Sequence, residues 1–456
     1  MSRKAPGPSP ALLGLDQVSR LRRDMLGFFT NLHETYGDAV RVRIGPYVQY
    51  FFFHPDEIKE VLTAKADRFV KIKRARQVLS QWDGNGLVLS EGAFWQRQRR
   101  LMQPAFHHDR VRKHGETMVA ITARLRDGWH AAATRAGHLD VDVNDAMTAL
   151  TLNIASETLF GADISRQTAP LGEAIAVLSD EAVKEFQEPF TLPRWVPLAR
   201  VRRKWAAVDL LDTTVRQIIR ERRASTDGDR GDLLSMLLEA ADHEHDGGQM
   251  TDEQVRDEAI TLLLAGHDTS AAGLTWLWHN LARHPEVLER AVAEVDALGS
   301  RLPSASDLKQ MPYLEAVLKE SLRLHPPALG VFTREATQEV EIGGYRLKRG
   351  HRVQLLSFVT QRDPRWFPDP ERFDPERFST ARAEQIPQYA YFPFGAGPRV
   401  CIGRQFALTE MLLVAATMLQ TLRPAPQPGA PPVELLPHLS LRPKAGLPLR
   451  WTARRP

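Results

Sequence analysis

Apolar and polar residues alternate most clearly near the start of the chain. Between residues 39 and 44, aliphatic residues alternate with arginines. Gly45-Pro46 follows, and a second apolar run extends to residue 53. Alternation with a period of two on both sides of a Gly-Pro pair predicts a β-hairpin. A proline-containing turn at 54–56 then begins a short helix, which we expect to reach Leu62.

Farther along, the spacing of apolar residues changes from strand-like to helical. From about 95 to 240 the helical period dominates, whereas 325–395 is rich in proline and aromatic residues, with strands expected near 339–343 and 352–359. No repeat and no polar linker divides the chain. The pattern predicts one mainly α domain with small β-sheets (α+β) over residues 1–456, with β-rich portions at about 38–70, 325–395 and 425–456 and helical portions at about 90–325 and 402–422.

The longest predicted helix begins at Thr251, where Gln254 completes a capping box, and it continues to about Arg283. Its middle is apolar on nearly every face, which predicts burial on all sides. The stretch 259–278 has the length of a membrane span, but His267-Asp268 at its centre makes insertion into lipid unfavourable. We therefore interpret it as a buried helix of a large globular protein.

Polar residues interrupt this helix in the segment Ala265-Gly266-His267-Asp268-Thr269-Ser270. The Thr269 hydroxyl lies one turn after the Ala265 carbonyl, so it can bond that carbonyl and bend the helix. Two interpretations stay open from the residues alone. The segment is either a kinked core helix with locally satisfied side chains or a proton-delivery pair, Asp268 and Thr269, facing a buried cofactor.

Composition narrows the class of protein. The chain is 43% hydrophobic and 25% charged with a net charge of +4, which excludes collagen-like, coiled-coil and largely disordered proteins. The chain has no basic run interleaved with aromatic residues, so the sequence does not support nucleic-acid binding. The N-terminus is rich in proline and glycine and has no long apolar stretch, so we expect neither a signal peptide nor a membrane anchor there. The single cysteine, Cys401, excludes an intrachain disulfide and fits a reducing compartment such as the cytoplasm.

The segment around that cysteine has an unusual composition. Gly395 and Gly397 permit a tight loop, Arg399 adds a positive charge, and Cys401 stands at the start of a helix predicted over about 402–422. A helix N-terminus stabilises a thiolate. One cysteine is too few for a zinc–cysteine or iron–sulfur centre, whereas a single thiolate suffices to ligate haem iron.

The sequence F-G-A-G-P-R-V-C-I-G at 394–403 resembles the haem-binding signature of the cytochrome P450 family. Three more segments resemble family motifs, in the family's order: A-G-H-D-T-S at 265–270, E-S-L-R at 320–323, and P-E-R-F at 375–378. The resemblance covers about the whole chain. It implies a triangular, mainly helical body around a buried haem, in a soluble bacterial-type enzyme without a fused reductase.

The resemblance also implies roles for individual residues. Cys401 becomes the axial ligand of the iron of haem b, and Asp268 and Thr269 become the acid–alcohol pair that supplies protons during oxygen activation. Glu320, Arg323 and Arg377 form a buried structural network. The resemblance implies further haem contacts by Trp95, Arg99, Ala265, Arg334, Phe394, Arg399 and Gly403. It implies a substrate pocket lined by Leu263, Ala265, Leu329 and Val331.

The implied activity is insertion of one oxygen atom from O₂ into a lipophilic molecule, such as a terpenoid, a fatty acid or a steroid-like compound. Electrons from NAD(P)H arrive through a separate partner of the ferredoxin or flavodoxin type, whose acidic surface we expect to dock near Arg99, Arg100, Arg110, Arg112 and Lys113. The alternatives are a haem-thiolate binding or sensing protein without turnover, and a peroxide-using or rearranging member of the family.

Two further clusters of histidine are interpreted as ordinary surface. The acidic His-x-His run at 242–246 has metal-ligating residue types, but it lies in a polar stretch that we expect to be a solvated loop. His107-His108 receives the same interpretation.

Overall fold

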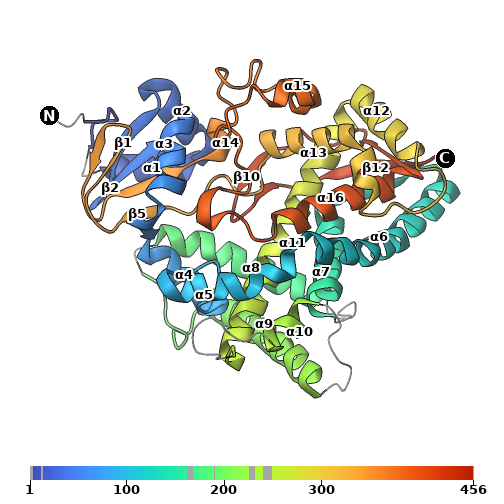
Figure 1. Cartoon of the computed structure of the whole chain (residues 1–456), viewed down its shortest axis with the longest axis horizontal. Coiled ribbons are helices and arrows are strands. Elements are labelled where there is room, and N and C mark those ends of the chain that lie inside the picture. The colour runs from blue at the N-terminus through green and yellow to red at the C-terminus, as the bar shows by residue number, and fades with distance from the viewer. Residues whose placement is uncertain are drawn as a thin grey trace. The chain divides into compact units, whose positions relative to one another are not determined.

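A computed structural model gives the structure of residues 4–11, 14–161, 168–188, 190–224, 232–239 and 249–454 (Figure 1). The chain forms two compact units, each built from two separate stretches. The first unit comprises Met1–Ala75 with Lys319–Cys401, and the second comprises Arg76–Leu318 with Ile402–Pro456. The chain crosses between the units within α4 (Lys73–Asp83) and α13 (Pro312–Leu324), and just after the cysteine.

The first unit is organised by a five-stranded sheet of order β1-β2-β8-β5-β3. The predicted hairpin is confirmed: β1 and β2 are antiparallel, with Ala39 opposite Phe52 and Ile44 opposite Tyr47. Strand β8 is parallel to β2, so the C-terminal stretch of this unit adds strands to the N-terminal hairpin. The strands are β1 (Ala39–Ile44), β2 (Tyr47–Phe52), β3 (Phe69–Lys71), β5 (Arg334–Ala336) and β8 (Arg352–Leu355).

One expected strand is shorter than the sequence indicates. Instead of 352–359, β8 ends at Leu355, and the backbone turns into a short helix in which the Thr360 N–H donates to the Leu356 carbonyl (3.0 Å). The remaining elements of this unit are α1 (Leu15–Arg23), α2 (Met25–Tyr36), α3 (Pro55–Lys59), η2 (Glu60–Ala64), η3 (Ala66–Arg68), β6 (Val340–Ile342), β7 (Tyr345–Leu347), α14 (Ser357–Thr360), η6 (Pro375–Phe378), α15 (Thr380–Ala383) and η7 (Gly397–Arg399).

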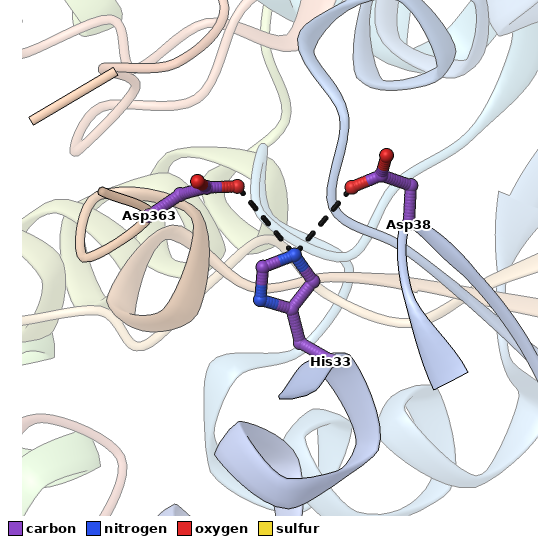
Figure 2. Close-up of side chains that lie close together, drawn as sticks. All are labelled: His33, Asp38 and Asp363. Carbon is purple, nitrogen blue, oxygen red and sulfur yellow. Dashed lines mark ion pairs between the residues drawn. The ribbon is translucent and has the colours of Figure 1, made fainter. Parts of the chain in front are cut away.

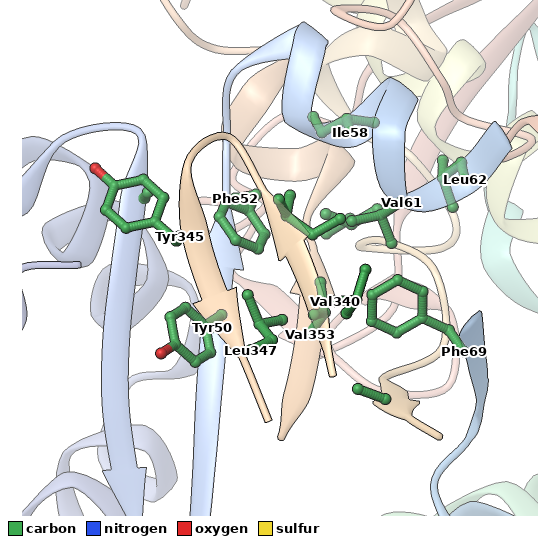
Figure 3. Close-up of a cluster of buried hydrophobic side chains, with 14 of the residues drawn as sticks. Tyr50, Phe52, Ile58, Val61, Leu62, Phe69, Val340, Tyr345, Leu347 and Val353 are labelled. Atoms are coloured by element: carbon green, nitrogen blue, oxygen red, sulfur yellow. The ribbon is translucent and has the colours of Figure 1, made fainter. Parts of the chain in front are cut away.

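The core of the first unit lies between this sheet, the β6–β7 hairpin and the helical turns after β2. Figure 3 shows side chains from these elements converging, with Phe52 and Val353 from the sheet facing Ile58 and Leu347. All four are fully buried. Burying an aliphatic or aromatic side chain contributes about 1.5–3 kcal/mol, so this cluster fixes the sheet to the segment 55–64.

The second unit is mostly helical, as the spacing of apolar residues predicts. Its small sheet has the order β4-β12-β9, and β10 and β11 pair as a separate hairpin. The helices and strands are α5 (Gly92–Met102), η4 (Gln103–Phe106), α6 (His108–Ala136), β4 (Leu139–Asp142), α7 (Val143–Phe160), α8 (Thr168–Gln187), α9 (Ala199–Ala224), α10 (Leu233–Glu239), α11 (Asp252–Arg283), α12 (Pro285–Asp296), η5 (Asp307–Gln310), α16 (Arg404–Leu419), β9 (Leu422–Pro426), β10 (Leu435–Pro437), β11 (Leu441–Pro443) and β12 (Pro448–Ala453).

Helix α11 is the centre of the second unit. The predicted capping box is present, because the Thr251 hydroxyl accepts from the Gln254 N–H and the Gln254 side chain accepts from the Thr251 N–H. The helix packs against α7, α9 and α16, and these neighbours explain why its middle is apolar on nearly every side. None of the helices in the described part of the chain is long and apolar enough to cross a membrane.

Candidate active site

The cysteine lies at the end of a loop closed by its own backbone. The Cys401 N–H donates to the Phe394 carbonyl (3.0 Å), and the Val400 N–H donates to the Gly397 carbonyl (3.1 Å). Gly395 and Gly397 both have positive φ, at 68° and 67°, where glycine is favoured. The loop therefore presents the thiol of Cys401, which is exposed, three residues before α16 begins at Arg404.

Gly397 has a second reason to be glycine. A Cβ at this position would collide with the backbone carbonyl of Leu62 in the π-helical turn η2. The loop is thus held close to the segment after the N-terminal hairpin, through main-chain atoms that cannot give way. Sequence reasoning predicted the tight turn here, but it missed this contact.

The residues predicted as a structural network lie together in the first unit. Arg323 on α13 donates through Nε and a terminal nitrogen to both carboxylate oxygens of Glu320, at 2.7 and 2.8 Å. Arg377 approaches the same carboxylate at 3.4 Å, and the Asp374 N–H donates to it at 2.9 Å. Glu320 and Arg323 are completely buried, so these bonds replace all contact with water.

A second charged cluster in this unit has the residue types of a metal site. The Nε2 atom of His33 lies 3.4 Å from Asp38 and 3.5 Å from Asp363 (Figure 2). Arg365 supplies the cation here: its guanidinium pairs with both carboxylates and, as the main cause, holds the pKa of Asp38 well below its usual range. We therefore assign this cluster a structural role, joining α2 to the segment after α14.

The polar segment of α11 is open to solvent on one side only. Ala265 is exposed and Thr269 is partly exposed, whereas His267, Asp268 and Ser270 are buried. The Thr269 hydroxyl donates to the Ala265 carbonyl at 2.7 Å, the bond that the sequence predicts. Gly266 is partly exposed too, and a Cβ at this position would meet the Leu159 side chain at an ordinary contact distance of 3.8 Å. We call the accessible side formed by Ala265, Gly266 and Thr269 the exposed strip of α11.

Asp268 forms an ion pair that sequence reasoning missed. Its carboxylate pairs with the guanidinium of Arg442, which comes from strand β11 in the C-terminal tail. No local motif marks Arg442, since it lies in a proline-rich stretch of short apolar pairs.

Two more titratable groups are buried beside this segment. Burial, together with the smaller effect of the Arg442 charge, lowers the pKa of the His267 imidazole to about 3, so the ring is neutral. Neither of its ring nitrogens has a hydrogen-bond partner among the described residues. On α16, burial raises the pKa of Glu410 to about 8, and the Ser270 hydroxyl offsets this only in part.

The buried carboxyl of Glu410 predicts a specific pH dependence of stability. The pKa of a glutamate is about 4.3 in the unfolded chain, whereas that of Glu410 is about 8 in the folded protein. Between these two pH values the folded state binds a proton that the unfolded state has lost, so the free energy of unfolding falls as the pH rises from about 4.3 to about 8. We expect Glu410→Gln to leave the free energy of unfolding unchanged at pH 4 and to increase it at pH 8.5, by at most about 5 kcal/mol at ~1.4 kcal/mol per pKa unit.

Denaturant unfolding at both pH values measures this effect. Glu289→Gln is the control, because Glu289 is exposed and pairs with Arg423 at 2.9 Å. Its effect should stay within about 0.5 kcal/mol at either pH. An equal gain for both variants at pH 8.5 contradicts the assignment of a buried, protonated carboxyl to position 410.

Trp95 and Arg99 line one concave surface of the second unit. The hollow has a volume of about 810 Å³ and is formed by α5, η4 and the start of α6. Its chemistry suits carboxylate groups beside an apolar ring, since arginine binds carboxylates through two parallel N–H donors. The lining residues are Trp95, Gln96, Arg99, Arg100, Gln103, Pro104, His107, Asp109 and Arg110.

The segment after α4 is tied to α11 by buried carboxyl groups. Glu258 accepts from the Leu87 N–H (2.8 Å) and from the Gln98 amide (3.0 Å), while Asp83 accepts from the Thr261 hydroxyl (2.5 Å). Burial raises the pKa of both Asp83 and Glu258 to about 7. These bonds give the segment a fixed backbone beside the first turns of the helix.

The predicted pocket residues do not share one environment. Leu263 is buried beside a small internal gap between α7, α8, α9 and α11, lined also by Phe160 and Val215. It does not share the exposed strip with Ala265, because residues two apart on a helix point about 200° apart. In the first unit, Leu329 and Val331 are partly exposed, and Arg334 is buried in β5.

Of the two histidine clusters interpreted as surface, one is described. His107 and His108 are exposed at the start of α6, as expected. The run 242–246 lies outside the described residues.

Comparison with known proteins identifies the class. The family model for Cytochrome P450 matches residues 4–449. The chain is 37% identical over 430 residues to cyclooctatin synthase from Streptomyces melanosporofaciens, and over 431 residues to cyclooctat-9-en-7-ol 5-monooxygenase from the same organism; each match covers 93% of this chain and 90% of the relative. The crystal structure of the cytochrome P450DA heme domain has a TM-score of 0.88 at 28% identity, covering 100% of this chain and 98% of that one.

The chain therefore belongs to the cytochrome P450 family, and the predicted P450 fold is confirmed. It is a cytochrome P450 monooxygenase, the activity that the resemblance implies. The family implies a haem cofactor and an external redox partner.

Proposed function

We propose that this P450 binds haem b through Cys401 and oxygenates a terpenoid. The observation that carries the proposal is the exposed thiol of the only cysteine, on a loop closed by the Phe394 carbonyl and two glycines of positive φ. The residues fit such a group in two further places. Trp95 and Arg99 line a hollow suited to carboxylates, and α11 has its exposed strip beside Gly266.

In this proposal Arg99, Arg334 and Arg399 hold the propionates, and Phe394 and Gly403 surround the cysteine. When bound, the haem supplies activation of O₂, helped by electron donation from the thiolate sulfur. Glu320, Arg323 and Arg377 keep the α13 region and the stretch leading to the cysteine loop in one arrangement, through bonds that exclude water.

Asp268 and Thr269 handle protons. Thr269 is partly exposed, and its hydroxyl can turn from the Ala265 carbonyl to donate toward the open strip of the helix. Asp268 is the carboxylate next to Thr269 in the sequence, and its ionised oxygens can accept a proton and pass it toward the neighbouring hydroxyl. Retention of both groups favours a monooxygenase with coupled turnover over a sensing protein or a peroxide-using enzyme.

The proposed substrate is a lipophilic terpenoid alcohol or hydrocarbon. One of the two relatives that are 37% identical is named cyclooctat-9-en-7-ol 5-monooxygenase, and the name describes oxygenation of an unsaturated alcohol. Leu329 and Val331 in the first unit and Ala265 in the second are apolar and at least partly exposed, so each is available to a lipophilic molecule, whereas Leu263 is buried.

We propose a ferredoxin or flavodoxin-type partner that carries electrons from NAD(P)H. The exposed Arg112 and Lys113 and the partly exposed Arg99, Arg100 and Arg110 provide a basic region for an acidic protein. A chain with a single cysteine suits the reducing cytoplasm, where we place the reaction.

Two measurements test the proposed function. A difference-spectrum screen of terpenoid alcohols should identify ligands that perturb the haem, and a surrogate ferredoxin system should convert those ligands to singly oxygenated products with consumption of NAD(P)H. Ligand binding without product under any electron donor would favour the sensing protein. Product formation with peroxide alone, and none with NAD(P)H, would favour the peroxide-using enzyme.

Thr269→Ala should uncouple turnover while leaving the protein intact. The variant lacks the hydroxyl that can donate at the exposed strip. We expect NAD(P)H consumption to continue, product per NAD(P)H to fall at least about 10-fold, and peroxide to be released instead, because a positioned proton-transfer group typically contributes about 10²–10⁴-fold to a rate. The measurement is the ratio of product to NAD(P)H consumed, with peroxide quantified alongside.

The same helix offers a matched control. Thr275 also donates to the carbonyl one turn earlier, that of Ala271 at 2.8 Å, but it is fully buried. Thr275→Ala removes the same hydroxyl and the same kind of bond, and we expect its product ratio to equal that of the parent enzyme. Equal ratios for all three proteins would assign Thr269 a purely local role in the helix.

A further inference from the structure

Arg442 is the charged neighbour of the proposed proton-delivery acid. It lies on β11, and its guanidinium pairs with the carboxylate of Asp268 on α11. The Nε atom of Arg442 donates to the Ser440 hydroxyl at 3.2 Å, which orients the guanidinium. Asp268 is only 7% exposed, so this pair lies largely out of water, where its interaction is screened weakly.

The hairpin β10–β11 is held to two helices at points that precede Arg442 in the chain. Trp276 on α11 donates through its indole nitrogen to the Leu441 carbonyl at 2.8 Å, directly before the arginine. At the turn of the hairpin, His438 lies 3.3 Å from Asp180 on α8. The backbone before Arg442 is therefore held by two helices, and this positions the Arg442 side chain beside Asp268.

The electrostatic surroundings leave Arg442 as the partner of Asp268. The neighbouring His267 is neutral, because burial lowers its pKa to about 3, so it supplies no positive charge. Among the described residues, Arg442 is the one cation that forms an ion pair with Asp268. Within the described part of the chain, the carboxylates whose charges act on Arg442 are Asp145 on α7 and Asp180 on α8, and Asp180 also lies 3.3 Å from His438 on the hairpin.

Asp145 and Asp180 give the arginine alternative partners. Burial lowers the pKa of Arg442, and both carboxylates act against this, so their charges reach the guanidinium. A guanidinium that turns toward them leaves the carboxylate of Asp268 without its counter-ion. An acid that loses a nearby cation in a site of low exposure binds a proton more readily.

We propose that Arg442 is a positioning residue that holds Asp268 ionised and turned toward the hairpin, and that Asp268 takes up protons when this pair opens. The proposal rests on the proposed function, in which Asp268 delivers protons. It makes the C-terminal hairpin a determinant of how readily the enzyme couples NAD(P)H consumption to product.

A direct titration of Asp268 tests the pair without turnover. Infrared difference spectra of the carboxyl C=O band, recorded against pH for the full-length holoenzyme and assigned by its loss in Asp268→Asn, give the titration midpoint of Asp268. We expect Arg442→Met to move that midpoint upward by about 1–3 pH units, the usual effect of an arginine on a neighbouring carboxyl, and Arg442→Lys to restore most of it.

A matched control separates charge from folding. Arg450 on β12 pairs with Asp140 at 2.8 Å in the same unit, so Arg450→Met is the same substitution in another Arg–Asp pair, and it should leave the Asp268 midpoint unchanged. A shift of equal size in both variants, or no shift in Arg442→Met at retained haem content, overturns the proposal. The first outcome would indicate a general loss of structure, and the second an ion pair without influence on proton uptake.

Turnover then links the titration to function. The pH at which product per NAD(P)H falls to half should move with the infrared midpoint in Arg442→Met, and the double variant Arg442→Met/Asp268→Asn should behave as Asp268→Asn alone. If Asp268→Asn has no effect on coupling while the infrared shift persists, the proposed role of Asp268 fails and the Arg442–Asp268 pair remains. If Asp268→Asn uncouples turnover but the midpoint does not shift, only the role of Arg442 fails.

Discussion

Cys401→Ala is expected to eliminate monooxygenase activity completely. The chain has no second cysteine, so no other thiolate can replace the lost ligand. The Cys401 side chain is exposed and its loop is closed by main-chain bonds from the cysteine N–H and from Val400, which alanine retains. We therefore expect a folded protein in which the thiolate-type absorbance of the reduced carbon monoxide complex is absent.

Three measurements check this expectation together. The reduced carbon monoxide spectrum reports the ligand, product formation with a surrogate redox partner reports turnover, and far-ultraviolet circular dichroism reports the fold. Cys401→Ser provides a second variant of nearly the same size, and it should also lose the thiolate band. A thiolate-type band in the alanine variant would contradict the ligand assignment, because the polypeptide would contain no sulfur other than methionine.

Local sequence patterns predicted those parts of the site that local structure positions. The glycines around the cysteine, the capping box at Thr251 and the hydroxyl bond of Thr269 all depend on residues within a few positions of one another. Spacing alone is sufficient there, because turn geometry and the helical repeat determine which groups meet. The hairpin over 39–53 belongs to the same class.

Contacts between distant segments were beyond those patterns. Arg442 meets Asp268, and the Gly397 backbone meets Leu62, yet nothing near Arg442 or Leu62 in the sequence indicates either contact. The family resemblance assigned both Leu263 and Ala265 to the substrate pocket, whereas the helical repeat places their side chains on different sides of α11. Such pairings depend on how helices and strands pack, which a single sequence encodes only through the whole core.

Arg323→Ala is expected to prevent accumulation of stable holoenzyme. The substitution removes both bonds to Glu320 and leaves that carboxylate fully buried, where the remaining arginine, Arg377, approaches no closer than 3.4 Å. It also removes the donor that reaches the Gln361 carbonyl at 2.8 Å. Breaking a buried ion pair costs about 3–5 kcal/mol, a large part of a total stability of about 5–15 kcal/mol.

The same unit contains a matched arginine–glutamate pair on its surface. Arg346 lies 2.6 Å from Glu339, but both side chains are at least half exposed, so Arg346→Ala should leave the denaturant midpoint close to that of the parent. Haem content and the denaturant midpoint of the two variants, purified in parallel, give the comparison.

Because Arg323→Ala is expected to fold poorly, Arg323→Lys supplies a milder step. It keeps one charge but loses the planar fork, so its midpoint should fall between those of the alanine variant and the parent. Equal midpoints for Arg323→Ala and Arg346→Ala would show that the buried network contributes no more than a surface ion pair, and its proposed role in supporting the cysteine loop would then fail.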